Sequence, residues 1–191
     1  LEHGGVAPVI VDPTADLDDA LPLLVRGGFY HAGQVCVSVQ RIYVHHSIAS
    51  DFTERFVQAA QALRTGNSLD PETDVGPLIH RDELTRVHAW VQEAVAAGAT
   101  LLCGGHALGP STYAPTVLLD PPDSARVSCE EIFGPVVAVY PYRDLDEAIA
   151  RANAPDVFFQ ASIFTRDLDT ALSASRRLAG MAVLVNDHTA F

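Results

Sequence analysis

The sequence contains no lysine, and its charge is strongly one-sided. All twelve basic residues are arginines, and they face twenty-four aspartates and glutamates, which gives a formal net charge of −12 over 191 residues. A chain with this balance offers no basic patch that could neutralise the phosphates of a nucleic acid or of an anionic membrane surface. We therefore expect neither of these among its partners.

Long apolar runs are missing as well, although 48% of the residues are hydrophobic. No run approaches the roughly 18 residues that a membrane span requires, and no basic segment followed by an apolar one opens the chain. This composition predicts one soluble domain over residues 1–191, with a sizeable core and a cytoplasmic location.

Cysteine is scarce. The three cysteines, at positions 36, 103 and 129, form no CxxC pair and no cluster with histidine. This spacing argues against a disulfide framework and against a structural zinc site, so we expect no bound metal. The GxGxxG fingerprint of dinucleotide-binding domains is also absent.

Short apolar runs alternate with segments of helical periodicity along the whole chain. The spacing predicts strands at Val6–Val11, Arg41–His45, Thr100–Cys103, Pro115–Leu119, Val136–Tyr140, Ala161–Phe164 and Met181–Val185, and helices around Leu21–Phe29, Phe52–Leu63, Leu84–Val95, Leu145–Ala152 and Leu168–Leu178. Ser50 is expected to cap the second helix, and Gly98 is expected to end the third. This alternation is typical of an α/β fold, a mostly parallel sheet with helices on both faces.

The segment from Phe29 to Cys36 is the most informative for chemistry. A helix-like stretch leads into Gly33-Gln34, and a single cysteine follows two residues later. Glycine permits a tight turn that lifts a thiol into a cleft, and N–H groups at an adjoining helix terminus would lower the pKa of that thiol. The alternative is that Cys36 is a small buried hydrophobe, as most lone cysteines are.

Two further segments combine carboxylates with turn residues. Glu2 stands just before Gly4-Gly5 and the first predicted strand, although a Leu-Glu-His start can also be a cloning scar. Residues 129–135 place Glu130 and Glu131 before Phe133 and a Gly-Pro turn that leads into a strand. As a bare pattern, this second segment is a charged loop with a core phenylalanine.

Together these segments resemble the aldehyde dehydrogenase superfamily, and the resemblance spans all 191 residues. No single motif is specific to this superfamily, but the occurrence of all of them in this order is. The matching motifs are Glu2-x-Gly4-Gly5, Gly33-Gln34-x-Cys36, Gly76-Pro77-Leu78, Pro115-Thr116-Val117, Glu130-Glu131-Ile132-Phe133-Gly134-Pro135, Phe164-Thr165-Arg166-Asp167 and Val185-Asn186.

The resemblance implies a fold of the aldehyde dehydrogenase catalytic-domain type and the NAD- or NADP-dependent oxidation of a small-molecule aldehyde to an acid. Cys36 matches the nucleophile that forms a thiohemiacetal and, after hydride has left for the nicotinamide, a thioester. Glu2 matches the general base that activates water for hydrolysis of this thioester. The Cys36 backbone N–H would supply half of the oxyanion hole.

The resemblance also implies residues that contact the cofactor and the substrate. Glu131 matches the acceptor of hydrogen bonds from the nicotinamide-side ribose, and Phe133 matches an aromatic that packs beside the same end of the cofactor. The residues that would line the aldehyde tunnel are Val35, Val37, His188 and Phe191; core aliphatics and a terminal loop remain the alternative for these four.

The sequence departs from the family pattern around the base. His3 replaces a small or aliphatic residue, and Val6 replaces a residue that is usually polar. Both flank Glu2, so they place its orientation in doubt. A third departure, Phe158-Phe159-Gln160 in place of the common Tyr-Gly-Leu, indicates a structural variation.

In the family, most of the cofactor site precedes the position of Leu1, and the strand that builds the oligomer follows the position of Phe191. We therefore expect a catalytic domain without its dinucleotide-binding domain and oligomerisation strand. The full-length enzyme is expected to be a dimer or tetramer. The 191-residue polypeptide is expected to fold without oxidising aldehydes by itself.

Several alternatives stay open at this point. A CoA-dependent acylating enzyme is disfavoured because that chemistry needs no water-activating base such as Glu2. A cysteine hydrolase would need Cys36 and an ordered histidine, for example His31. The chain could also be a folded module with only residual thiol or esterase reactivity, and a zinc enzyme is the weakest alternative for want of clustered ligands.

Overall fold

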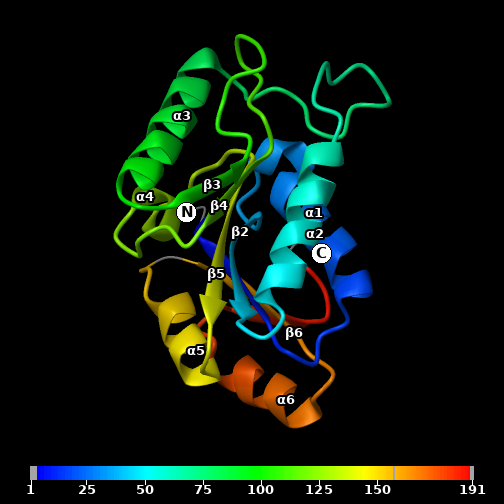
Figure 1. Ribbon diagram of the computed structural model, residues 1–191, viewed down its shortest axis with the longest axis vertical. Helices are drawn as coiled ribbons and strands as arrows, with labels where there is room; N and C mark the ends of the chain where they lie inside the picture. Colours follow the sequence, from blue (N-terminus) through cyan, green and yellow to red (C-terminus); the bar gives the residue numbers. More distant parts are fainter. Residues whose placement is uncertain (1–3, 157, 190–191) are drawn as a thin grey trace.

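The computed structural model describes residues 4–156 and 158–189, and these form one sheet with helices packed around it (Figure 1). The strands are β1 (Ala7–Val11), β2 (Val39–His45), β3 (Thr100–Cys103), β4 (Thr116–Leu119), β5 (Val136–Tyr142), β6 (Gln160–Phe164) and β7 (Ala182–Val185). The α-helices are α1 (Leu17–Phe29), α2 (Ala49–Ala62), α3 (Arg81–Ala96), α4 (Arg126–Cys129), α5 (Leu145–Asn153) and α6 (Leu168–Arg177), and a 3₁₀ helix covers Tyr30–Gly33.

The sheet has the strand order β3-β4-β5-β2-β1-β6-β7. All neighbouring strands pair in parallel except β3, which runs antiparallel to β4 at one edge. Parallel strands need crossover connections, and α1, α5 and α6 lie on such connections. The predicted α/β fold with a mostly parallel sheet is therefore confirmed.

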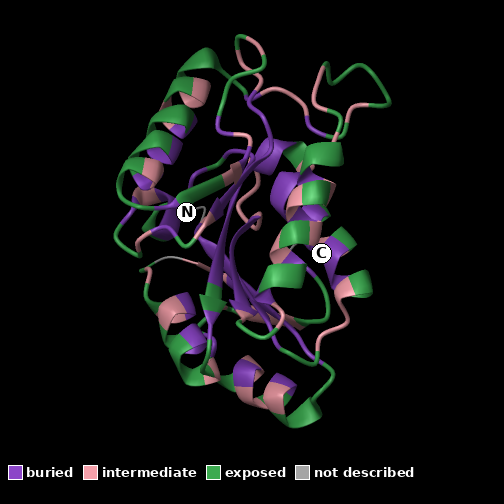
Figure 2. Cartoon of the chain, in the orientation of Figure 1, coloured by how far each residue is buried: buried purple, intermediate pink, exposed green. Residues whose placement is uncertain are grey.

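Each face of the sheet buries its own hydrophobic cluster. Val9 and Val11 of β1 contribute to the cluster under α1, α2 and α3, whereas Ile10 between them contributes to the cluster under α5 and α6. This alternation follows from the period of two along a strand. Figure 2 shows the buried residues along the strands and the exposed residues on the outer sides of the helices. Helices thus cover both faces, as predicted.

The predicted strands and the helices α5 and α6 are confirmed to within one or two residues, whereas α1 begins four residues, and α2 and α3 three residues, before the predicted helices. Ser50 is not the cap of α2, which begins at Ala49 after Ile48 and has no side-chain cap. The four-residue helix α4 lies directly before the carboxylate segment and was missed, because one helical turn leaves no periodic pattern. Gly98 follows the last turn of α3 with φ +113°, as expected of a residue that ends a helix.

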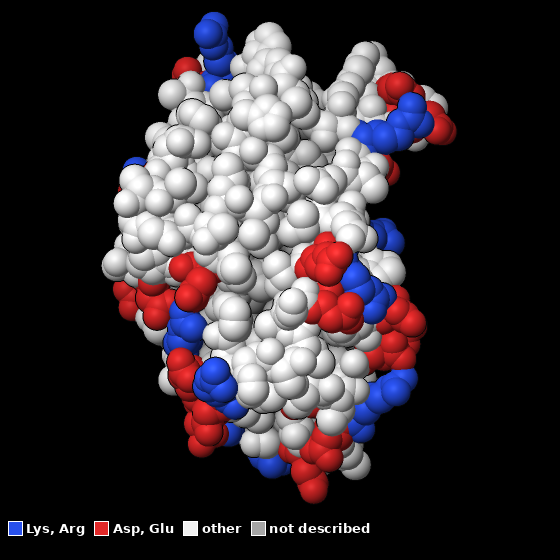
Figure 3. All heavy atoms as spheres, viewed as in Figure 1, with Lys and Arg blue, Asp and Glu red and all other residues white. Residues whose placement is uncertain are grey.

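The surface carries arginines interleaved with the more numerous acids (Figure 3). In this view the charged side chains gather toward the lower half and the right edge, and the upper central surface is mostly uncharged. Several arginines are paired, for example Arg151 with Asp123 at 2.8 Å and Arg177 with Asp146 at 2.6 Å. Among the helices of the described residues, none is long and apolar enough to cross a membrane.

Candidate active site

Cys36 occupies a hydrogen-bonded turn directly before β2. The Ser38 N–H donates to the Val35 carbonyl at 2.9 Å, so Cys36 is the first central residue of the turn. The Thr189 hydroxyl donates to the Val37 carbonyl at 2.5 Å, and the Ser38 hydroxyl donates to the Gly27 carbonyl at 3.2 Å. Cys36 itself is partly exposed. The turn therefore leaves Cys36 partly accessible and outside the two hydrophobic clusters.

The helices that precede this turn meet it with their C-terminal ends. α1 ends at Phe29, and the 3₁₀ helix ends at Gly33. A helix C-terminus leaves carbonyl groups without intrahelical partners, whereas free N–H groups belong to the N-terminus. The expectation that an adjoining helix supplies N–H groups to Cys36 is therefore wrong for these two helices.

The last three residues of the 3₁₀ helix have a left-handed backbone and lead into the cysteine turn. His31, Ala32 and Gly33 have φ values of 50°, 56° and 69°. At Gly33 there is no space for a side chain, because a Cβ would overlap the Gly134 carbonyl oxygen and lie 2.6 Å from the Gly134 carbonyl carbon. This close approach brings two predicted motifs, the Cys36 segment and the loop that carries Phe133, into direct contact.

The contact predicts a large difference between two glycine substitutions. Gly33→Ala should lower the free energy of unfolding by about 2–4 kcal/mol, because left-handed strain and the clash with Gly134 add together. Gly98→Ala is the matched control, since Gly98 also has a positive φ but a Cβ there would meet no atom within 4 Å. Gly98→Ala should lower the free energy of unfolding by about 1–2 kcal/mol. Urea denaturation of both variants measures this, and equal losses would contradict the contact.

Glu131 lies beside the start of β1. Its carboxylate packs against the backbone of Gly4, where a Cβ would lie 2.6 Å from Oε1. The two residues border a hollow of about 560 Å³, together with Gly5, Val6 and Glu130. Glu2 stands two residues before Gly4 but lies outside the described residues, so its role as the base stays a prediction.

Phe133 borders a second, larger hollow. It has φ 50° and its side chain is 39% exposed, which is unusual for a large aromatic. The hollow measures about 870 Å³, and its wall includes Val35, Tyr30, Gln34 and His31. The structure thus brings Phe133 and Val35 together, while Glu131 faces the hollow described above.

Gln34 links two of the motifs, a role that sequence reasoning did not assign. Its side-chain amide donates to the Pro77 carbonyl at 3.3 Å and accepts from the Ile79 N–H at 2.8 Å. These bonds hold the segment around Gly76-Pro77 against the cysteine turn. The only sequence signal was the position of Gln34 between Gly33 and Cys36.

His188 lies close to the turn but is mostly buried. It packs against Gly27 of α1, where a Cβ would lie 2.9 Å from the His188 Cβ, and its ring centroid is 6.3 Å from that of Tyr30. Burial lowers the pKa of His188; the negative charge of Asp187 opposes this shift, and the positive charge of Arg26 adds to it. Val37 is partly buried, and its carbonyl accepts from the hydroxyl of Thr189, the residue after His188. Both residues stay predictions as tunnel residues, and Phe191 lies outside the described residues.

The other two cysteines differ from Cys36 in their surroundings. Cys103 is 8% exposed, and this burial raises the pKa of its thiol. Burial, followed by the neighbouring negative charge of Glu130, raises the pKa of Cys129. A raised pKa leaves less reactive thiolate at neutral pH.

Cys36 is therefore expected to be the fast-reacting thiol of the three. Iodoacetamide at pH 7 should label Cys36 first, and labelling of Cys129 should catch up as the pH rises toward its raised pKa. Peptide mass spectrometry after short exposures measures the order. Preferential labelling of Cys103 or Cys129 at pH 7 would count against Cys36 as the nucleophile.

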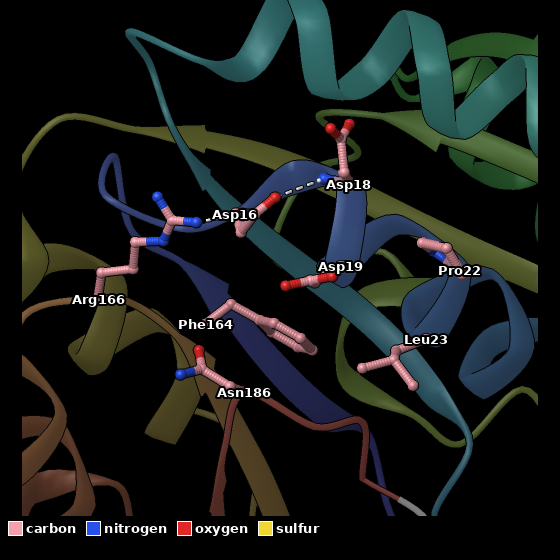
Figure 4. A pocket seen from close by; sticks show the side chains of 8 residues that line it. All are labelled: Asp16, Asp18, Asp19, Pro22, Leu23, Phe164, Arg166 and Asn186. Carbon is pink, nitrogen blue, oxygen red and sulfur yellow. Dashed lines mark hydrogen bonds and ion pairs between the residues drawn. The ribbon is translucent and has the colours of Figure 1, made fainter.

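A separate hollow of about 510 Å³ lies at the carboxyl ends of β6 and β7 (Figure 4). Asp16, Asp19 and Leu23 come from the start of α1 and its N-terminal flank, and Arg166 reaches across to pair with Asp16. None of the predicted site residues that the structure describes lines this hollow. Among the described residues there is no group of three or more histidines, cysteines or carboxylates that could hold a metal ion.

Comparison with known proteins places this geometry in a family. The sequence pattern of the aldehyde dehydrogenase family matches residues 1–191. A 3-sulfolactaldehyde dehydrogenase from Priestia aryabhattai is 41% identical, and an aspartate-semialdehyde dehydrogenase 1 from Pseudomonas canavaninivorans is 44% identical, each over 191 residues. Each match covers 100% of this chain and 40% of the relative. The chain therefore spans about two fifths of the length of these relatives.

Solved structures give the same result. Aldehyde dehydrogenase 21 from Physcomitrella patens, in complex with the reaction product succinate, superposes with a TM-score of 0.95 at 41% identity, over 98% of this chain and 39% of that one. The glyceraldehyde-3-phosphate dehydrogenase GapN from Methanocaldococcus jannaschii, complexed with NADP, superposes with a TM-score of 0.95 at 38% identity, over 98% and 41% of the two chains.

Proposed function

This chain belongs to the aldehyde dehydrogenase family, and from that membership we propose that the full-length protein oxidises an aldehyde to a carboxylic acid with NAD or NADP. The observation that carries the proposal is the contact between Gly33 and Gly134. This contact joins the turn that presents Cys36 to the loop that bears Glu131 and Phe133. The proposed nucleophile and the residues proposed to hold the cofactor thus lie on two segments that touch, with Glu131 and Phe133 bordering separate hollows.

The proposed role of Cys36 is to form a covalent bond with the substrate. Its thiolate attacks the aldehyde carbon, and the acyl group later rests on its sulfur as a thioester. The turn is closed by the N–H of Ser38 and not by that of Cys36. We propose that the Cys36 N–H donates to the aldehyde oxygen, which becomes negative during the attack.

Glu2 is proposed to release the product. As a water molecule attacks the acyl carbon, the carboxylate takes its proton; the C–S bond then breaks, so that the acid is released and the Cys36 thiolate is restored. The Glu131 carboxylate packs against Gly4, two residues after this base. This contact supports the proposal that the base and the cofactor-side carboxylate act at the same end of β1.

The residues present fit the nicotinamide end of a dinucleotide. Phe133 offers a partly exposed ring in the same hollow as Val35. Glu131 offers a carboxylate, and hydrogen bonds to the residues on either side of it fix its backbone. A bound NAD or NADP supplies the hydride acceptor that aldehyde oxidation needs. Glu131 is proposed to accept hydrogen bonds from the ribose, and Phe133 is proposed to pack beside the nicotinamide.

The relatives differ in the charge of the aldehydes in their names. 3-Sulfolactaldehyde carries an anionic sulfonate, and aspartate semialdehyde carries both a carboxylate and an ammonium group. Betaine aldehyde, in the name of a relative from Cereibacter sphaeroides that is 43% identical over 173 residues, is cationic. We propose a small-molecule aldehyde without choosing among these. Val35, Val37, His188 and Phe191 are proposed to line its path.

The proposal includes the organisation of the longer protein. Residues 1–191 are proposed to form the catalytic domain, and the remaining cofactor contacts and the oligomer contacts are proposed to lie in the parts of the relatives that this chain does not match. The full-length protein is then a homo-oligomer. In isolation, the 191-residue chain would keep only slow thiol or esterase reactivity at Cys36.

Trapping the acyl group tests the proposal. The full-length protein is incubated with NAD or NADP and a panel of anionic, cationic and neutral aldehydes, and formation of reduced cofactor is recorded. Acid quenching of the active mixtures, followed by peptide mapping, should show an acyl mass on the peptide that contains Cys36. The absence of reduced cofactor across the whole panel would overturn the proposal, and an acyl group passed on only when CoA is added would indicate the acylating alternative.

A further inference from the structure

The side chain of Gln40 makes an unusually complete set of hydrogen bonds for a residue without an assigned role. Gln40 lies in β2, four residues after Cys36, and is 5% exposed. Its amide nitrogen donates to the carbonyls of Val127 at 2.9 Å and Glu130 at 2.8 Å. Its amide oxygen accepts from the Ile132 N–H at 3.1 Å. Both amide protons and the amide oxygen are thus used on one short segment.

Two of these bonds flank Glu131. The Glu130 carbonyl and the Ile132 N–H are the groups that a parallel neighbouring strand would bond on either side of Glu131. Here one side-chain amide takes the place of that strand. The backbone of Glu131 is therefore held from both sides, although Glu131 lies outside the strands of the sheet.

A β-bulge aims Gln40 at this segment. Ala7 of β1 pairs with Val39, but the next residue, Pro8, pairs with Arg41, so Gln40 is an extra residue in β2. In a regular strand, residues three positions apart point to opposite faces of the sheet. Because of the bulge, Val39 and Ile42 belong to the same hydrophobic cluster. Bulges of this kind redirect a side chain, and they are common next to active sites.

We infer that Gln40 is a positioning residue, which holds Glu131 at a fixed place relative to Cys36 so that Glu131 can bind the ribose of the cofactor. The inference rests on the proposed function. Gln40 lies in β2, and the Cys36 turn comes directly before this strand. The same strand therefore anchors both the proposed nucleophile and the side chain that holds the Glu131 segment. Without the amide, two carbonyls and one N–H of residues 127–132 would lose their partners, and the segment would shift.

The variant Gln40→Met tests this in the full-length protein. Methionine has a similar length and shape but none of the three hydrogen bonds. Fluorescence titration with NADH or NADPH should give a dissociation constant about 10–100-fold higher than in the wild type, the range expected for a misplacement on the order of 1 Å. Gln61→Met is the matched control, because Gln61 is exposed on α2, and it should leave the constant unchanged.

A second readout separates positioning from loss of structure. The rate at which iodoacetamide alkylates Cys36 should be the same in Gln40→Met as in the wild type, because the turn at residues 35–38 keeps its own hydrogen bonds. A variant that fails to fold would change the alkylation rate and the cofactor affinity together.

The variant Gln40→Glu gives a test by pH. A carboxylate can accept from the Ile132 N–H but cannot donate to the Glu130 carbonyl, and burial raises the pKa of such a group. Its protonated form donates again, so the cofactor affinity of this variant, relative to the wild type, should rise as the pH falls from about 8 to 6. Gln40→Met should show no such gain.

The outcomes separate the two hypotheses. If the wild type binds neither NADH nor NADPH, the proposed function fails. If the wild type binds one of them and Gln40→Met binds it equally well, the proposed function stands and the positioning role of Gln40 is overturned.

Discussion

Replacement of Cys36 by alanine in the full-length protein is expected to abolish aldehyde oxidation, with kcat lowered by about 10⁴–10⁶-fold. Without the thiolate no covalent bond to the aldehyde carbon can form, and neither of the other two cysteines lies in this turn. The thiol is partly exposed in a turn fixed by three hydrogen bonds, so its removal should leave the fold intact. Steady-state formation of reduced cofactor measures the loss.

The control for this variant is Cys103→Ala. Cys103 is buried in β3 at the edge of the sheet, and it lines neither the hollow at Glu131 nor the hollow at Phe133. Its replacement removes a thiol without touching the proposed site, and kcat should stay near the wild-type value. Unchanged binding of NADH or NADPH by Cys36→Ala would show that the cofactor site has survived. Activity retained by Cys36→Ala would remove the basis of the proposed mechanism.

Replacement of Glu2 by glutamine is expected to slow the release of the acid by about 10²–10⁴-fold. The amide cannot take a proton from water, whereas attack by the Cys36 thiolate can proceed once the thiol is ionised. Stopped-flow recording should therefore show a rapid burst of reduced cofactor followed by a stalled steady state. The acyl group should accumulate on Cys36 and be detectable by intact mass.

Glu147→Gln serves as the matched control, since Glu147 is an exposed carboxylate in the first turn of α5. It should show neither a change in the burst nor a slower steady state. A Glu2→Gln variant that lost the burst but kept a normal steady state would contradict the role of Glu2 as the base for thioester hydrolysis.

The order of strands and helices follows from the sequence because it depends on local patterns. β1 and β5 are apolar runs next to turn residues, and the amphipathic spacing of α2, α3 and α5 is visible residue by residue. Helix ends were less predictable. Ser50 has the right residue type for a cap, yet α2 starts one residue earlier without one, because the tertiary packing of Ala49 and Phe52 outweighs the single cap.

The sequence by itself determined the family, the fold class and the candidate residues, because motifs such as Gly33-Gln34-x-Cys36 are short and local. Only the tertiary structure showed that Gly33 touches Gly134, that Gln34 holds the Pro77 segment, and that Gln40 clamps the backbone around Glu131. These contacts join residues 43 to 101 positions apart in the chain. Hydrogen bonds and steric contacts at such separations leave no periodic trace in a single sequence. The orientation of Gln40 also depends on a bulge in β2 that appears only when β1 and β2 pair.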